Sequence, residues 1–175
     1  SLEDNIKLNE TFISPFLHTV NVNSKERIEL DKFIDIFLNK IEFIFNKSNI
    51  KLERKFELKN ASVLINPYML ETVLISLLQN AIESFQNEGT VRVVLYENDK
   101  HHCVLSIQDD GCGINEELLP KVGNLFMTTK RTSDHIGVGL YFVNNYARNQ
   151  HWKFSITSEV QIGTTVKLTI PKLQK

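Results

Sequence analysis

Residues 102–113 read HCVLSIQDDGCG, an alternating run that ends in two aspartates and two glycines. Side chains alternate between the two faces of a strand, so Leu105, Ile107 and Asp109 share one face. Two apolar members predict that this face is the core, so the Asp109 carboxylate is expected to point inward and to need partners. Two interpretations are open: a carboxylate that caps the following turn, or an acceptor for the amino group of a ligand.

The longest apolar pattern follows Asn66 and Pro67, a capping side chain and a proline that together predict the start of a helix. Within it, Ser76, Asn80 and Ser84 recur at every fourth position and form a polar row along one edge of the apolar face. Such a residue is usually a satisfied amide or hydroxyl at the edge of a core. An amide oxygen is, however, also a suitable ligand for Mg²⁺.

The rest of the chain predicts helices and strands without internal repeats. Apolar spacings of three and four predict helices, and period-two alternation between turn residues predicts strands. The expected helices span 31–46, 67–85 and 139–149. The expected strands span 50–58, 62–65, 90–97, 102–109, 152–157 and 165–170. Residues 21–26 are polar and are expected to form a connector.

Residues 111–136 have no sustained period beyond a helical turn expected at 115–119, and glycine pairs flank the segment. Loops of this length are uncommon in compact domains and are often lids or binding loops. Thr129, Lys130 and their neighbours supply hydroxyl donors and cations that suit phosphate oxygens. A solvated basic loop is the common alternative.

Two further glycine motifs follow. Gly137 and Gly139 precede Leu140 at the start of the last helix, where backbone N–H groups and the helix dipole favour anions. An ordinary loop is equally compatible with this pattern. Gly163 and Thr164 are first of all a turn between strands.

These signals occur in a fixed order, and together they resemble the motifs of one family. Residues 79–83 (QNAIE) resemble its N box, 109–113 (DDGCG) its G1 box, 126–130 (FMTTK) its F box, 137–140 (GVGL) its G2 box and 163–164 (GT) its last glycine motif. The family is the catalytic, ATP-binding domain of bacterial sensor histidine kinases, within the superfamily of gyrase, Hsp90, histidine kinase and MutL. The resemblance covers residues 31–171.

The resemblance implies an α+β fold, a two-layer α/β sandwich with a mixed, largely antiparallel sheet, helices on one face and a long ATP lid. It implies that Asn80 coordinates Mg²⁺ and that Asp109 accepts a hydrogen bond from the adenine N6 amine of ATP. Lys130, as a cation of the lid, would be catalytic together with Asn80. The other nucleotide-binding residues implied are Gly111, Gly113, Thr129, Gly137, Gly139, Leu140 and Thr164, with Thr165 as the alternative to Thr164.

Three residues depart from the family pattern. Ser76 lies one turn before Asn80, where the ATPase branches of the superfamily carry a glutamate as general base. A serine has no comparable basicity at neutral pH, so vigorous ATP hydrolysis is not expected. His135 replaces the first glycine of the fuller G2 pattern, and Glu83 stands where many kinases carry a basic residue.

The family's phosphoacceptor is a histidine followed by an acidic residue and, a few positions later, a proline. None of the five histidines has that context. Residues 1–25 resemble the end of a dimerisation helix and a connector, so the catalytic domain is expected at 26–175. The implied partners are the dimerisation segment of the same kinase and a response regulator. A homodimer is expected for the full-length protein, and a monomer for this fragment.

Composition restricts the class of protein further. The 175 residues are 42% hydrophobic and 23% charged, as is typical of one globular domain with a modest extension. A net charge of −1 argues against a protein built to bind nucleic-acid backbone. Two cysteines and the lack of a long apolar run favour a cytoplasmic location, with a membrane anchor left open for the full-length protein.

The sequence therefore predicts a protein histidine kinase whose catalytic domain binds Mg-ATP. It would transfer the γ-phosphoryl to a histidine on another segment, for relay to a response regulator. A conformational ATPase and a degenerate nucleotide-binding interaction module are the alternatives. Ser76 counts against the first, and the intact Asn80 and Asp109 count against the second.

Overall fold

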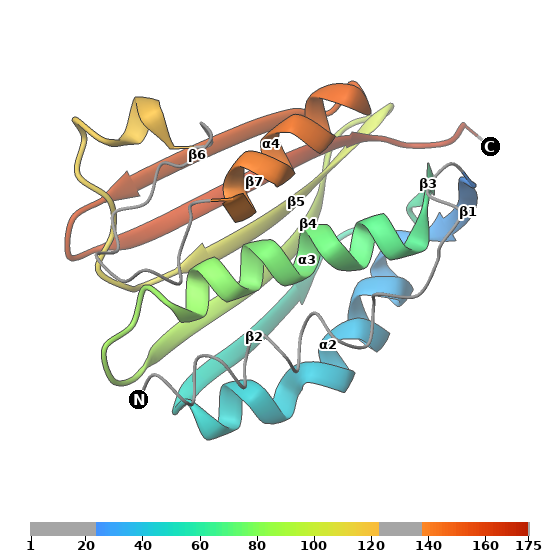
Figure 1. The fold of residues 1–175 in the computed structure, drawn as a ribbon. Coiled ribbons are helices and arrows are strands. Elements are labelled where there is room, and N and C mark those ends of the chain that lie inside the picture. Colours follow the sequence, from blue (N-terminus) through green and yellow to red (C-terminus); the bar gives the residue numbers. More distant parts are fainter. Residues whose placement is uncertain (1–23, 123–137, 175) are drawn as a thin grey trace.

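The computed structural model describes residues 24–122 and 138–174 (Figure 1). Within these residues, three α-helices lie together over one face of a five-stranded sheet, with α3 between α2 and α4 (Figure 1). This arrangement confirms the predicted two-layer sandwich. Residues 1–23 and 123–137, which include most of the predicted dimerisation segment and much of the predicted lid, lie outside the described part.

The helices are α2 (Leu30–Lys47), α3 (Pro67–Ile82), α4 (Val138–Asn149) and a short 3-10 helix, η2 (Leu119–Lys121). The strands are β1 (Glu26–Glu29), β2 (Ile50–Phe56), β3 (Ser62–Ile65), β4 (Gly89–Asp99), β5 (His102–Asp109), β6 (Lys153–Glu159) and β7 (Gly163–Pro171). Strand β1 was not predicted, because its sequence ERIE contains a single apolar residue. A helical turn is present at 115–119, as predicted, because Leu119 N donates to Asn115 O at 3.0 Å, and η2 follows it directly. Helix α3 ends a turn earlier than the apolar pattern does.

The large sheet has the strand order β2-β4-β5-β7-β6. Strand β2 is parallel to β4 and the other neighbours are antiparallel, so the sheet is mixed and largely antiparallel, as predicted. Strands β1 and β3 form a separate antiparallel pair. Within the large sheet, Asp109 at the end of β5 lies between Val91 of β4 and Thr164 of β7.

The hydrophobic core lies between the helices and the sheet. Helix α3 begins at its predicted cap, where Asn66 Oδ1 accepts a hydrogen bond from Met69 N at 3.1 Å. Its inward face is fully apolar, and burial of each leucine contributes about 1.5–3 kcal/mol. The core residues with no exposed surface include Leu70, Leu74, Leu78, Leu95, Leu105 and Leu168. In the described ranges, no helix is both long enough and apolar enough to cross a membrane.

Candidate functional site

Asp109 lies on the helix side of the sheet, as the alternation of β5 predicts. Its Oδ1 accepts hydrogen bonds from Ser84 Oγ and from Gly111 N, both at 3.0 Å. Burial raises the pKa of the Asp109 carboxyl above its ordinary value, and these two donors and a backbone hydrogen bond from Thr164 only partly oppose that shift. Asp109 therefore caps its turn through one oxygen while remaining a half-buried acceptor.

The turn after β5 is packed tightly against the end of α3. A Cβ on Gly111 would lie 1.9 Å from Ser84 Oγ and 2.5 Å from Ser84 Cβ, so a larger residue would collide there. Cys112 N donates to Ser84 O at 3.0 Å. Gly113 has φ +68°, and a Cβ there would lie 2.0 Å from Glu159 O. The glycines of this motif are thus required by contacts within the protein.

The start of β7 completes this side of the site. Gly163 has φ +131°, and a Cβ there would lie 1.9 Å from Asp109 O. The next residue, Thr164, is 4% exposed and lies opposite Asp109 across the β5–β7 pair. Its hydroxyl is 2.8 Å from Ser158 Oγ, which also accepts a hydrogen bond from Ile114 N at 2.8 Å.

Ser158 is a site-supporting residue that sequence reasoning missed. It joins the loop after β5 to the start of β7 through the bonds just described, and its Oγ also lies 2.9 Å from Gly163 O. The signal was present in the alternation of Phe154, Ile156 and Ser158, which places the serine on the helix side of β6.

The predicted polar row on α3 runs from Asp109 to the first turn of α4. Ser84, at one end, contacts Asp109. Ser76, at the other end, is near the first turn of α4, because a Cβ on Gly139 would lie 3.8 Å from Ser76 Cβ. Asn80 lies between them, about 6 Å along the helix from each. Asn80, Asp109 and Gly139 are therefore on the same side of the molecule.

Asn80 is half-buried and makes no side-chain hydrogen bond to the part of the chain that the structure describes. The described residues also contain no cluster of three or more His, Cys, Asp or Glu side chains that could hold a metal ion. A cation beside Asn80 would need most of its ligands from bound phosphates and water, which is the coordination that Mg²⁺ usually has in nucleotide sites. The residues present therefore fit a magnesium–nucleotide complex.

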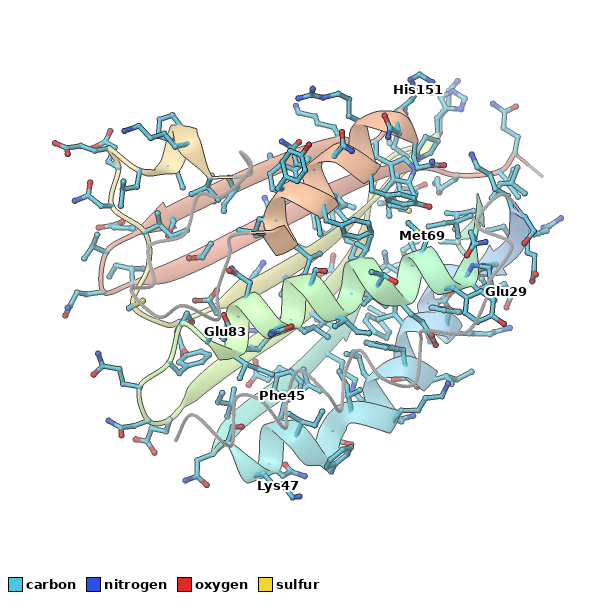
Figure 2. All side chains as sticks on the ribbon, in the orientation of Figure 1. Glu29, Phe45, Lys47, Met69, Glu83 and His151 are labelled. Carbon is cyan, nitrogen blue, oxygen red and sulfur yellow. The ribbon has the colours of Figure 1, made fainter. Side chains whose placement is uncertain are left out.

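Glu83 lies at the C-terminal end of α3 and Met69 at its N-terminal end (Figure 2). The side chain of Glu83 runs back along the helix, where its Oε1 accepts a hydrogen bond from Gln79 Nε2 at 3.0 Å. Gln79 is therefore one partner of the acidic residue that replaces the family's basic one.

The remaining predicted residues divide into two groups. Leu140 is partly buried and packs against the core, so its described contacts are structural. Thr129, Lys130, His135 and Gly137 lie outside the described residues, and their roles remain predictions.

The second aspartate of the motif, Asp110, differs from Asp109. It is exposed, and its Oδ1 accepts a hydrogen bond from Thr90 N at 2.6 Å, which ties the strand end to β4. Asp110 also lines an open groove at the ends of β2 and β4, together with Asn49, Lys51, Glu88, Gly89, Thr90, Gln161 and Ile162. Asp109 does not line that groove.

Comparison with known proteins identifies the class. The family described as "Histidine kinase-, DNA gyrase B-, and HSP90-like ATPase" matches residues 65–174. Sporulation kinase A of Bacillus subtilis (strain 168) is 30% identical, over 85% of this chain and 24% of that protein. Histidine protein kinase SaeS of Staphylococcus aureus (strain USA300) is 28% identical, over 93% of this chain and 49% of that protein.

Solved structures agree with this assignment. The nucleotide-free catalytic domain of histidine kinase ThkA superposes with a TM-score of 0.75 at 25% identity, over 85% of this chain and 96% of that domain. ThkA in complex with the response regulator protein TrrA gives a TM-score of 0.74 at 23% identity, over 98% of this chain and 49% of that one.

The chain belongs to the histidine kinase-, DNA gyrase B- and HSP90-like ATPase family. Its domain is an ATP-binding domain with the fold of histidine kinase catalytic domains. The chain spans 24% and 49% of the length of the two curated relatives named above.

Proposed function

We propose that this domain binds Mg-ATP and presents the γ-phosphoryl group to a histidine on a dimerisation segment outside this sequence. The observation that carries the proposal is the row on α3 that begins beside Gly139 and ends at Asp109. This row connects a carboxylate suited to a purine amine with a helix start suited to phosphates, and it has Asn80 between the two.

Each residue would act by position and charge, as phosphoryl transfer generally requires. Asp109 would accept from the adenine N6 amine, and the backbone at Gly139 would face phosphate oxygens. Bound Mg²⁺ would neutralise charge on the phosphates, with Asn80 as the protein ligand. Lys130 and Thr129 would approach the same phosphates from the lid.

Kinase activity is favoured over vigorous ATP hydrolysis by Ser76, which lies near the start of α4, at the phosphate end of the row. Efficient hydrolysis needs a general base for water, and a serine hydroxyl is not one at neutral pH. The acceptor would instead be the histidine, whose ring nitrogen is a nucleophile in its own right.

We infer two partners for the complete protein: the dimerisation segment that carries the acceptor histidine, and a response regulator. The first rests on the absence of a phosphoacceptor motif around the five histidines of the chain. The second is supported by the solved complex of ThkA with a response regulator protein. The homodimeric state of the complete protein, its location in the cytoplasm and the domain boundary near residue 25 stay predictions.

The test is transfer of ³²P from [γ-³²P]ATP to a supplied dimerisation segment of a related kinase, with the domain in catalytic amount. Asn80→Ala is expected to reduce Mg-dependent transfer at least about 100-fold, because the metal loses its protein ligand. Thr72→Ala is the matched control on α3, since the hydroxyl of Thr72 donates to Tyr68 O of its own helix, away from Asn80.

The control is expected to transfer phosphate like the parent, and a segment with alanine in place of its histidine is expected to remain unlabelled. Magnesium-dependent transfer that survives Asn80→Ala would refute the assigned role of Asn80. If the parent transfers no phosphate to the segment but hydrolyses ATP, the conformational ATPase would be favoured instead.

A further inference from the structure

We propose that Ser84 is a positioning residue for nucleotide selectivity, which holds Oδ1 of Asp109 so that Oδ2 is presented to the adenine amine. The inference rests on the proposed role of Asp109 as the adenine acceptor. Ser84 lies one turn beyond Asn80, in the same row that places the metal ligand.

The geometry gives the two carboxylate oxygens different tasks. Gly111 N donates to Oδ1 at 3.0 Å, and Ser84 Oγ lies 3.0 Å from the same oxygen and shares its single proton between Oδ1 and Ala81 O, so the protein itself contacts that oxygen from two sides. The rotation of the carboxylate about its Cβ–Cγ bond is thereby restricted. A ligand amine that approaches the site would meet Oδ2 in a defined orientation, which lowers the entropic cost of the contact.

Ser84 is itself held in place by its surroundings. Its Oγ lies 2.7 Å from Ala81 O, an acceptor that competes for the single hydroxyl proton. Its backbone O accepts from Cys112 N, and its Cβ is packed directly against Gly111. The end of α3 and the turn after β5 therefore form one unit, and removal of the hydroxyl alone leaves this packing intact.

A consequence for pH dependence follows from the groups that face the carboxylate. Among the described residues, these are the donors Gly111, Ser84 and Thr164, and the neighbouring Asp110, which opposes ionisation. Loss of the Ser84 donor removes a contact that favours the charged form, so the pKa of Asp109 is expected to rise further. Because the ionised carboxylate is the better acceptor, ATP binding is expected to require a higher pH in that variant.

The experiment compares the parent with Ser84→Ala by titrating ATP and GTP across a pH series with magnesium present. The expected result is about a 10-fold loss of ATP affinity, a smaller ATP-to-GTP preference, and a pH midpoint for ATP binding displaced upward. Thr72→Ala, which removes a similar hydroxyl bond to a helix carbonyl away from Asp109, is expected to leave all three readouts unchanged.

Unchanged affinity, preference and pH midpoint in Ser84→Ala would overturn the inference. So would a loss of ATP and GTP affinity by the same factor without a shift in the midpoint, because that pattern indicates a general structural effect. Asp109→Asn separates the two proposals. If it abolishes ATP preference while Ser84→Ala does nothing, the positioning role alone fails; if it leaves ATP preference intact, the adenine role of Asp109 fails.

Discussion

Helix α2 and the polar edge of α3 belong to the same helical layer, yet α2 contributes buried apolar side chains and the edge of α3 contributes polar ones. Helix α2 faces the core with Ile34, Phe37, Leu38 and Phe45, each at most 2% exposed. The edge of α3 instead presents two serines and an asparagine to a half-buried carboxylate and to the first turn of α4. The first region buries apolar surface, whereas the second leaves polar groups available for a ligand.

The stabilising part of α2 is its buried face. On its solvent side, Arg54 of β2 pairs with Asp35 at 2.9 Å and with Glu42 at 3.3 Å, and both acidic side chains are half exposed. Ion pairs of this kind typically contribute about 0–1 kcal/mol, whereas burial of one large apolar side chain contributes about 1.5–3 kcal/mol. The comparison therefore locates stability in the core, whereas the row supplies the candidate binding groups.

Asp109 shows that placing polar groups for a ligand can lower the stability of the fold. Burial disfavours its charged form, so the folded protein carries a carboxylate that would be more stable in water. A group that destabilises the fold and nevertheless lies at the centre of the candidate site is the pattern expected where binding rather than stability decides the residue.

The largest expected effect is on stability, from Phe45→Ala in α2. Phe45 has no exposed surface, so truncation is expected to lower the free energy of unfolding by about 3–5 kcal/mol. Urea denaturation followed by circular dichroism measures this. ATP affinity of the folded fraction is expected to stay within about twofold of the parent, because α3 lies between α2 and α4 and the row is on the α4 side of α3 (Figure 1). A larger loss of affinity would show that the two regions are not separable.

Gly163→Ala is expected to lower both the stability of the fold and the affinity for ATP. A Cβ there meets Asp109 O, a backbone atom that cannot rotate away, and φ +131° is strained for alanine. We expect the free energy of unfolding to fall by about 1–3 kcal/mol and ATP affinity to fall with it. Gly89→Ala is the matched control, since the nearest atoms to its Cβ would all belong to the ring of Phe85, a side chain able to move. Equal effects of the two substitutions would contradict this account.

The smallest effect on stability is expected from Asp109→Asn. The raised pKa means that the folded protein holds its proton to a higher pH than the unfolded chain, whose aspartates titrate near about 3.9. The free energy of unfolding of the parent should therefore decrease as pH rises from the unfolded pKa through the folded one, and stay lower above it.

Asp109→Asn removes this contribution, and its amide oxygen can still accept from Ser84 and Gly111. The variant should be at least as stable as the parent at pH 7 and should lose the corresponding slope in denaturation experiments across pH 4–8. The same change is expected to weaken ATP binding about 10- to 100-fold, because a hydrogen bond to a charged acceptor is lost. A variant that keeps the slope would show that another group titrates in this range.

Much of this architecture was predictable because the signals are local. The period of three and four in α2, the cap at Asn66 and the alternation in β5 each depend on residues close in the chain. The helices and most strands were found for that reason. Strand β1 was not, because it is short and polar and exists through its antiparallel pairing with β3.

The sequence predicted which residues form the candidate site better than it predicted the contacts between them. Asn80, Asp109 and the glycines were expected from their motifs, and the row with Ser76 and Ser84 from helical spacing. The contact between Ser84 and Asp109 joins residues 25 positions apart in the chain. No sequence period predicts a contact over that separation in the chain, and none predicts the hydrogen bonds of Ser158.

The order of residues along this chain alone determined the class of fold and the chemistry of the motifs, because propensity, alternation and capping act over a few neighbours. Tertiary structure decided which oxygen of Asp109 the protein occupies, which glycines tolerate no side chain, and that Asn80 lies between the carboxylate and the start of α4. Those outcomes depend on how α3, β5 and β7 pack together, and packing brings together atoms that the sequence keeps far apart.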